Sequence, residues 1–141
     1  MIWGAISGDG AGPIHRFDNV ANQNGYKALL EANKHYLKNR MLAQDNAPCH
    51  KARTITTWLR DEGIETLNWP SCSPDLNPIE HVWASIKRKL QGRHFLTKNL
   101  LWTELKQQWQ SFSQAEVLKY IDSMPSRIEA VIASKGKVSK Y

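Results

Sequence analysis

Residues 69–83 have the sequence WPSCSPDLNPIEHVW. Three prolines stiffen the stretch, and Glu80 lies within it, where a helical pattern begins. Upstream, 34 residues (46–79) separate Glu80 from Asp45, which belongs to the stretch QDNAPCH, residues 44–50. Asp45 closes a short apolar run and opens a turn. One carboxylate therefore follows a predicted strand, and the other begins a predicted helix.

The two acidic residues are candidate ligands of one metal site. Carboxylate oxygens are the ligands that Mg²⁺ and Mn²⁺ prefer. Two such ions, about 3.5–4 Å apart, can stabilise the attacking and leaving oxygens of a phosphodiester exchange. We therefore predict that Asp45 and Glu80 are catalytic metal ligands, lying close together and facing one open cleft.

Each acidic residue also has a simpler explanation. Asn77 and Glu80 have the spacing of a capping box, and a glutamate in the first turn gains about 0.3–1 kcal/mol from the helix dipole. Asp45 has the setting of an Asx turn that leads into the next helix. Neither explanation accounts for both settings occurring together, and both stay open from the sequence.

Composition limits the function classes. The 141 residues suit one domain, and a net charge of +6 favours nucleic acid as a partner, although a soluble basic protein remains the alternative. Two cysteines give no disulfide framework, and the zinc-type residues Cys49, His50, Cys72 and His81 fit no standard zinc finger. No apolar run approaches the roughly 20 residues of a membrane span, and residues 1–4 do not resemble a signal peptide.

The hydrophobic pattern predicts strands first and helices later. A hairpin is expected from residues 1–7 and 12–17, and short strands over residues 41–44 and 64–69. The expected helices cover residues 23–39 and 50–62, a segment beginning at Pro78, residues 98–110, a segment opened by Ser113, and a segment from Pro125 to Gly136. This order predicts a mixed α/β domain with a helical C-terminal half.

Two helix starts and one helix face are specific predictions. Asn77 is expected to cap the helix that bears Glu80, with Pro78 at its first position. Ser113 and Glu116 form a predicted capping box. In the last helix the residues expected to face inward are Ile128, Val131 and Ile132.

The two acidic stretches resemble motifs of the Tc/mariner transposases. Residues 44–50 resemble the motif around that family's second aspartate, and residues 69–83 resemble the motif around its final acidic residue. The spacing of 34 residues is that of the Tc branch. Matches at residues 1–4 and 123–128 extend the resemblance over essentially the whole chain.

The resemblance implies a ribonuclease-H-like (DDE integrase/transposase) domain, truncated at its N-terminus, over residues 1–141, and cut-and-paste DNA transposition. Two aspartates and one glutamate would hold two Mg²⁺ or Mn²⁺ ions, and Asp45 and Glu80 would be two of these three ligands. Asn77 and Pro78 would fix the start of the helix that aims Glu80.

DNA is the partner that the resemblance and the charge imply. We expect weak, salt-sensitive binding without sequence preference, through phosphate contacts. The candidate contacts are Lys87, Arg88, Arg93 and His50. Lys87 shares a helix stripe with Glu80, so it could meet phosphate near the metals, with a solvated lysine as the alternative. A full-length transposase is a second candidate partner, no membrane partner is expected, and the nucleus is the implied location.

The chain departs from the family pattern at its start. The family's first aspartate lies on a strand upstream of residue 1, and the N-terminal helix-turn-helix region is also absent. Asp9, Asp18 and Glu31 precede Asp45, but none matches the missing position. We therefore expect metal binding to be weak or absent and the isolated chain neither to cut nor to join DNA. A truncated or co-opted protein that binds DNA or a transposase without catalysis is the alternative.

Overall fold

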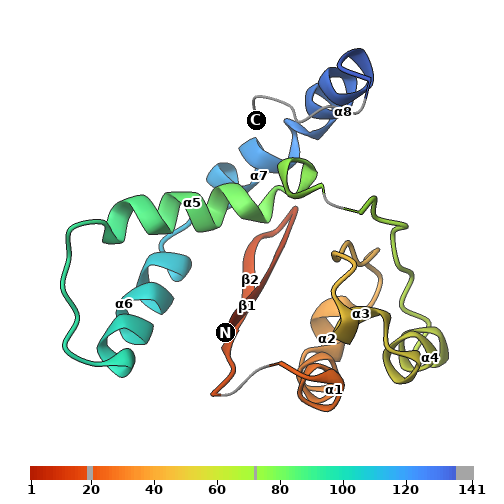
Figure 1. The fold of residues 1–141 in the computed structure, drawn as a ribbon, viewed down its shortest axis with the longest axis horizontal. Helices are drawn as coiled ribbons and strands as arrows, with labels where there is room; N and C mark the ends of the chain where they lie inside the picture. Colours follow the sequence, from red (N-terminus) through yellow and green to blue (C-terminus); the bar gives the residue numbers. More distant parts are fainter. Residues whose placement is uncertain (19–20, 72, 136–141) are drawn as a thin grey trace. The chain divides into compact units, whose positions relative to one another are not determined.

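The computed structural model describes residues 1–18, 21–71 and 73–135. The chain divides into two compact units, and Figure 1 colours its elements in sequence order. The first unit comprises Met1–Trp3 and His15–Cys72, and the second comprises Gly4–Ile14 and Ser73–Tyr141. The expectation of one domain over residues 1–141 stays a prediction.

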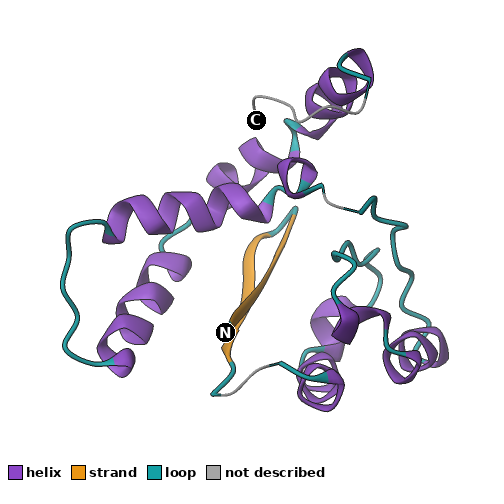
Figure 2. Cartoon of the chain, viewed as in Figure 1, coloured by secondary structure: helices purple, strands orange, loops and turns teal. Residues whose placement is uncertain are grey.

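The predicted hairpin is confirmed. Strand β1, Ile2–Ser7, pairs with strand β2, Gly10–Arg16, in a two-stranded sheet (Figure 2). Gly10 has a φ of 113°, a backbone conformation that favours glycine, and it follows the two-residue turn. The turn signal in the sequence therefore has a direct backbone cause.

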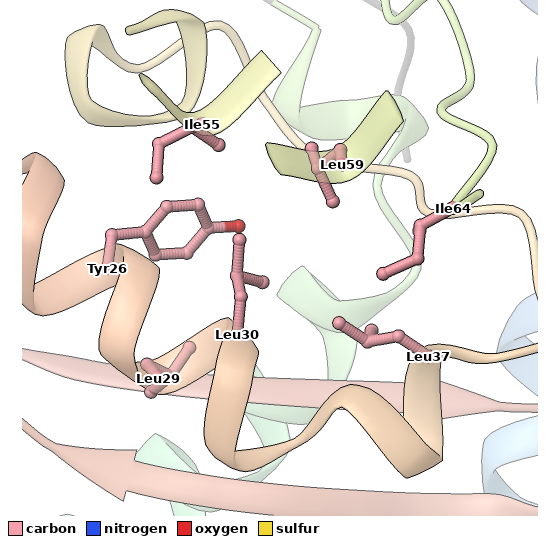
Figure 3. Packing of buried hydrophobic residues seen from close by; sticks show 7 residues of the cluster. All are labelled: Tyr26, Leu29, Leu30, Leu37, Ile55, Leu59 and Ile64. Carbon is pink, nitrogen blue, oxygen red and sulfur yellow. The ribbon is translucent and has the colours of Figure 1, made fainter. Parts of the chain in front are cut away.

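The first unit packs short helices around one apolar cluster. Its helices are α1 (Gln23–Ala32), α2 (Lys34–Leu37), α3 (Pro48–Lys51) and α4 (Arg53–Asp61). The buried side chains come from α1, α2, α4 and the segment after α4, and Figure 3 shows them: Tyr26, Leu29, Leu30, Leu37, Ile55, Leu59 and Ile64.

Both helices predicted in this unit are interrupted. The first breaks at Asn33, whose side-chain amide donates to the Leu29 carbonyl at 2.8 Å. The second begins earlier, at Pro48, and breaks at Ala52, which has an extended ψ of 137°. It then ends near Gly63 as predicted, where φ is 67°.

The strands predicted over residues 41–44 and 64–69 are wrong in extent. Within the described residues these segments form a single parallel bridge between Leu42 and Thr66. The Leu42 N–H donates to the Glu65 carbonyl at 2.8 Å, and the Leu67 N–H donates to the Leu42 carbonyl at 2.9 Å. Met41 is 58% exposed and Leu67 is 44% exposed, so the apolar pattern here does not correspond to a buried sheet in the described residues.

The second unit consists of the hairpin tip, Gly4–Ile14, and the helices that follow Ser73. Its elements are the 3₁₀ turn η1 (Pro74–Leu76) and the helices α5 (Ile79–Leu90), α6 (Lys98–Gln110), α7 (Gln114–Ile121) and α8 (Met124–Ala133). Helix α6 has the predicted bounds, and the Ser113–Glu116 capping box is present. The core consists of Val82, Ile86, Trp109, Phe112 and Val117.

Trp109 joins this core to the hairpin. Its ring stacks on Trp83 with centroids 4.7 Å apart, and its indole N–H donates to the Gly12 carbonyl at 2.9 Å. A Cβ atom added at Gly4 would lie 2.7 Å from the Trp109 ring. The strand therefore needs glycine at this position because the indole takes the space.

The predicted inner face of the last helix is wrong. Ile128 is 45% exposed and Ile132 is 71% exposed, whereas Arg127 is 2% exposed. The Arg127 guanidinium donates to the Asp75 carbonyl at 3.2 Å, so α8 turns a charged side chain inward to meet a backbone acceptor. Gly136, the predicted end of this helix, lies outside the described residues, as do residues 137–141. No helix in the described residues is long and apolar enough to cross a membrane.

Candidate functional site

Asp45 lies in the loop between the Leu42–Thr66 bridge and α3, and its side chain is 65% exposed. Its Oδ1 atom accepts a hydrogen bond from the Ala47 N–H at 3.0 Å, which confirms the Asx turn. The same oxygen lies 2.7 Å from Nδ1 of His50. The other oxygen, Oδ2, accepts no hydrogen bond from the described residues and remains available to a ligand.

The His50 ring rests on a buried tyrosine. The rings of Tyr26 and His50 have centroids 4.3 Å apart at an interplanar angle of 37°. The Tyr26 hydroxyl donates to Oε1 of Gln44, the residue before Asp45, at 2.6 Å. Burial raises the pKa of the Tyr26 phenol, with smaller contributions from Cys49 and Asp45, so the hydroxyl keeps its proton and acts as a donor. One side chain of α1 thus contacts residues on both sides of Asp45.

Asn46 ties the first acidic stretch to the beginning of the second. Its side-chain amide donates to the Trp69 carbonyl at 3.0 Å and to the Ser71 hydroxyl at 3.2 Å. Both partners belong to the first unit. The two stretches quoted from the sequence therefore meet in space at this point, through a residue that sequence reasoning did not single out.

Glu80 is exposed in the first turn of α5. Asn77 caps this helix, because its Oδ1 accepts from the Ile79 N–H at 3.3 Å and its carbonyl accepts from the Glu80 N–H at 3.1 Å. The helix begins at Ile79, one residue later than predicted, with Pro78 immediately before it. Val82 and Ile86 are buried and anchor the helix, so Glu80 has a fixed backbone. Asp45 and Glu80 belong to different units, and their proximity stays a prediction.

The predicted DNA-binding cations on α5 and in the loop after it differ in their surroundings. Lys87 and Arg88 are exposed, and neither forms an ion pair within the described residues. Arg93 pairs with Glu104 at 2.6 Å, and its hydrogen bond, with a second from Gln108, lowers the pKa of the Glu104 carboxyl. All three cations line one cleft of about 910 Å³ within the second unit. Of these three cations, Lys87 and Arg88 are therefore the two whose charge is not offset by a paired carboxylate within the described residues.

The pKa of the His81 imidazole, next to Glu80, lies below its ordinary value. Partial burial lowers the pKa of its imidazole, and the positive charges of Arg127 and Arg88 lower it further. Its ring stacks on Tyr120 with centroids 5.5 Å apart. The positive potential that acts on His81 also favours an anion near the start of α5.

Residues 1–102 match the model of the DDE superfamily endonucleases, a span that contains both Asp45 and Glu80. This chain belongs to the DDE superfamily endonuclease family. The Tcb2 transposase of Caenorhabditis briggsae is 35% identical over 147 aligned residues, covering 100% of this chain and 54% of the relative. The Tc1 transposase of Caenorhabditis elegans is 32% identical with the same coverage. The chain thus spans about half the length of these relatives.

The predicted fold class is confirmed by a solved structure. The catalytic domain of Mos1 transposase, solved with raltegravir and Mg, superimposes with a TM-score of 0.87. The match covers 99% of this chain and 76% of that one, at 23% identity. The chain therefore has the ribonuclease-H-like α/β fold of a DDE transposase domain, as the two acidic stretches predict.

The sequence predicts Asp45 and Glu80 as site residues, which stays a prediction, and it does not reveal the contacts around Asp45. Asp45 and His50 were predicted separately, as a metal ligand and a phosphate contact, but the structure brings their side chains together. The roles of Tyr26 and Gln44 were not foreseen, because the hydrophobic pattern shows only that Tyr26 is buried. One local signal pointed to the Asp45–His50 contact. The two residues are five positions apart, and an Asx turn followed by Pro48 lies between them.

Proposed function

We propose that this chain supplies part of the DNA-cleaving and DNA-joining domain of a Tc1/mariner-type transposase. The observation that carries the proposal is the 35% identity over the whole chain with a Tc-type transposase, across both acidic stretches. The exposed carboxylates of Asp45 and Glu80, each on a fixed backbone, support it. The non-catalytic alternative, a co-opted binding protein, is not favoured by these comparisons.

Divalent metal is the cofactor of this proposal. The Mos1 catalytic domain has been solved with Mg and with Mn. The donors present here fit such ions, since both are exposed carboxylates and Oδ2 of Asp45 is available. No group of three candidate ligands occurs within the described residues, so a further ligand would complete the site. Asp45 and Glu80 would hold the ions, which stabilise the negative charge of the reacting phosphate.

DNA is the proposed substrate. Mos1 transposase has been solved in a pre-cleavage transpososome and in a strand transfer complex. In this chain Lys87 and Arg88 would neutralise backbone phosphates, while the pairing of Arg93 with Glu104 makes Arg93 a weaker contact. Assembly with a full-length transposase and action in the nucleus are further parts of this proposal that rest on the family resemblance alone.

The metal site is tested by Mn²⁺ binding. The EPR signal of free Mn²⁺ falls as the ion binds, so a titration with the chain gives the affinity. We expect weak binding that Asp45→Asn or Glu80→Gln lowers by more than about tenfold, because each removes a ligand rather than an outer contact. Glu31→Gln is the control, since Glu31 is an exposed carboxylate paired with Lys27 on α1. Binding that neither substitution weakens would contradict the proposal.

A further inference from the structure

We propose that His50 is a positioning residue for Asp45, which fixes one carboxylate oxygen and thereby presents the other to a divalent cation. The inference rests on the proposed function, because it assigns a role within the same metal site. It replaces the simpler expectation that His50 touches DNA phosphate directly.

The contact defines which atom of His50 carries the hydrogen. Nδ1 of His50 lies 2.7 Å from Oδ1 of Asp45 and 3.2 Å from the Asp45 carbonyl oxygen. Both oxygens are acceptors only, so Nδ1 must be the donor. With the Ala47 N–H at 3.0 Å, Oδ1 has two donors and Oδ2 has none within the described residues. The carboxylate is thus held asymmetrically, with one oxygen directed to the protein.

The support beneath His50 is rigid. Its side chain is 16% exposed, and its ring lies against Tyr26, which is 1% exposed. The hydroxyl of Tyr26 also holds Gln44 at 2.6 Å. Because Gln44 and His50 flank Asp45 in sequence, one buried tyrosine fixes the loop on both sides of the ligand.

The physical consequence is a smaller entropy loss on metal binding. An exposed aspartate on a loop populates several rotamers, and ligation by one oxygen requires that one of them be selected. A hydrogen bond to the other carboxylate oxygen selects that rotamer before the metal binds. Groups that orient a metal ligand in this way typically change metal affinity by about 10–100-fold when removed.

The first test reads the hydrogen bond without metal. In ¹⁵N-labelled chain at about pH 8, where an unperturbed imidazole is neutral, long-range ¹H–¹⁵N spectra report the tautomer. We expect His50 to carry its hydrogen on Nδ1, and Asp45→Asn to alter this preference. His35, exposed on α2, is the internal control. A His50 ring with its hydrogen on Nε2 would overturn the inference.

The second test measures Mn²⁺ affinity by the same EPR titration. His50→Phe keeps the ring on Tyr26 but removes the donor, and we expect about tenfold weaker binding. His50→Asn places an amide N–H near the position of Nδ1 and should restore most of the affinity. His50→Gln places its amide near Nε2 and should not. His35→Phe is the matched control, and circular dichroism checks that each variant folds.

The outcomes separate this inference from the proposed function. Equal Mn²⁺ affinity in the unmodified chain, His50→Phe and His50→Gln overturns the positioning role, even when Asp45→Asn abolishes binding. Mn²⁺ binding by the unmodified chain that is insensitive to Asp45→Asn contradicts the proposed function instead. If His50→Phe fails to fold, the comparison of His50→Asn with His50→Gln decides, because the two differ only in where they place the amide.

Discussion

Asp45 and Glu80 are presented by different physical means. Glu80 depends on its immediate neighbours: Asn77 caps α5 through the Ile79 N–H, and the helix then fixes the backbone of its first turn. Asp45 depends on a tertiary arrangement, because His50 holds its carboxylate and the buried ring of Tyr26, 19 positions upstream in α1, supports His50.

The two carboxylates should therefore differ in how strongly substitutions far from them change their geometry. A helix start tolerates remote substitutions as long as the cap and the buried face of the helix remain. The Asp45 loop should lose its geometry when a core residue of another helix changes.

Removing the tyrosine ring should have the largest effect. Tyr26→Ala should lower the free energy of unfolding by about 3–5 kcal/mol, because it leaves a cavity in the first cluster and removes the platform under His50. Tyr26→Phe keeps the ring and loses the hydroxyl with its hydrogen bonds to the side chains of Gln44 and Trp3, a cost of about 1–2 kcal/mol. Urea unfolding measures both. Similar losses for the two variants would show that the ring is not the main support.

The core beneath α5 should respond to crowding at the hairpin. Gly4→Ala should destabilise the chain by about 1–3 kcal/mol, because the new methyl group would lie 2.7 Å from the Trp109 ring, which its bond to Gly12 holds in place. Gly8→Ala is the control, since no atom lies within 4 Å of the added Cβ. Thermal unfolding followed by tryptophan fluorescence compares them, and equal stability of the two variants would argue against this packing.

The local support of Glu80 should have a moderate effect. Asn77→Ala removes the hydrogen bond to the Ile79 N–H and should cost about 1 kcal/mol, whereas Asn77→Asp should be nearly neutral. Amide hydrogen exchange should quicken in the first turn of α5 and stay unchanged around Asp45. Asn24→Ala, on the exposed side of α1, is the control. Faster exchange spread evenly over the chain would contradict a local role.

The smallest effect concerns a second local helix start, at α7. The Ser113 N–H and hydroxyl bond to Glu116 and lower the pKa of its carboxyl below the ordinary value of 4.5. Because the folded-state pKa is the lower one, this stabilisation is present above about pH 4.5 and is lost as the pH falls through the folded-state value. The stability difference between the unmodified chain and Glu116→Gln should therefore shrink in that window. A pH-independent difference would contradict the assignment.

The local features of this fold were predictable from sequence, and the tertiary ones were not. Residues 98–110 and the Ser113–Glu116 box carry their periodicity and capping signals in adjacent positions, so both predictions are confirmed. The strand predicted over residues 41–44 forms only a single bridge within the described residues. The sequence does not reveal this, because a short apolar run looks the same whether or not other elements bury it.

The same limit applies to the candidate site. The Asx turn at Asp45 and the cap at Asn77 follow from neighbouring residues and could be predicted. The contacts of Tyr26 with Gln44 and His50 depend on how α1 packs against a loop about 20 residues away, which periodicity does not encode. The inward Arg127 is a further case, since its partner is a backbone carbonyl 52 residues away in the sequence.

The proposal that Asp45 and Glu80 serve one metal site is tested by paramagnetic broadening. Mn²⁺ added to ¹⁵N-labelled chain broadens the amide signals of residues near the bound ion. We expect broadening around residues 44–50 and 79–82 together, and we expect Glu80→Gln to reduce it around residues 44–50. Broadening of residues 44–50 that persists unchanged in Glu80→Gln would show that the two carboxylates do not share a site.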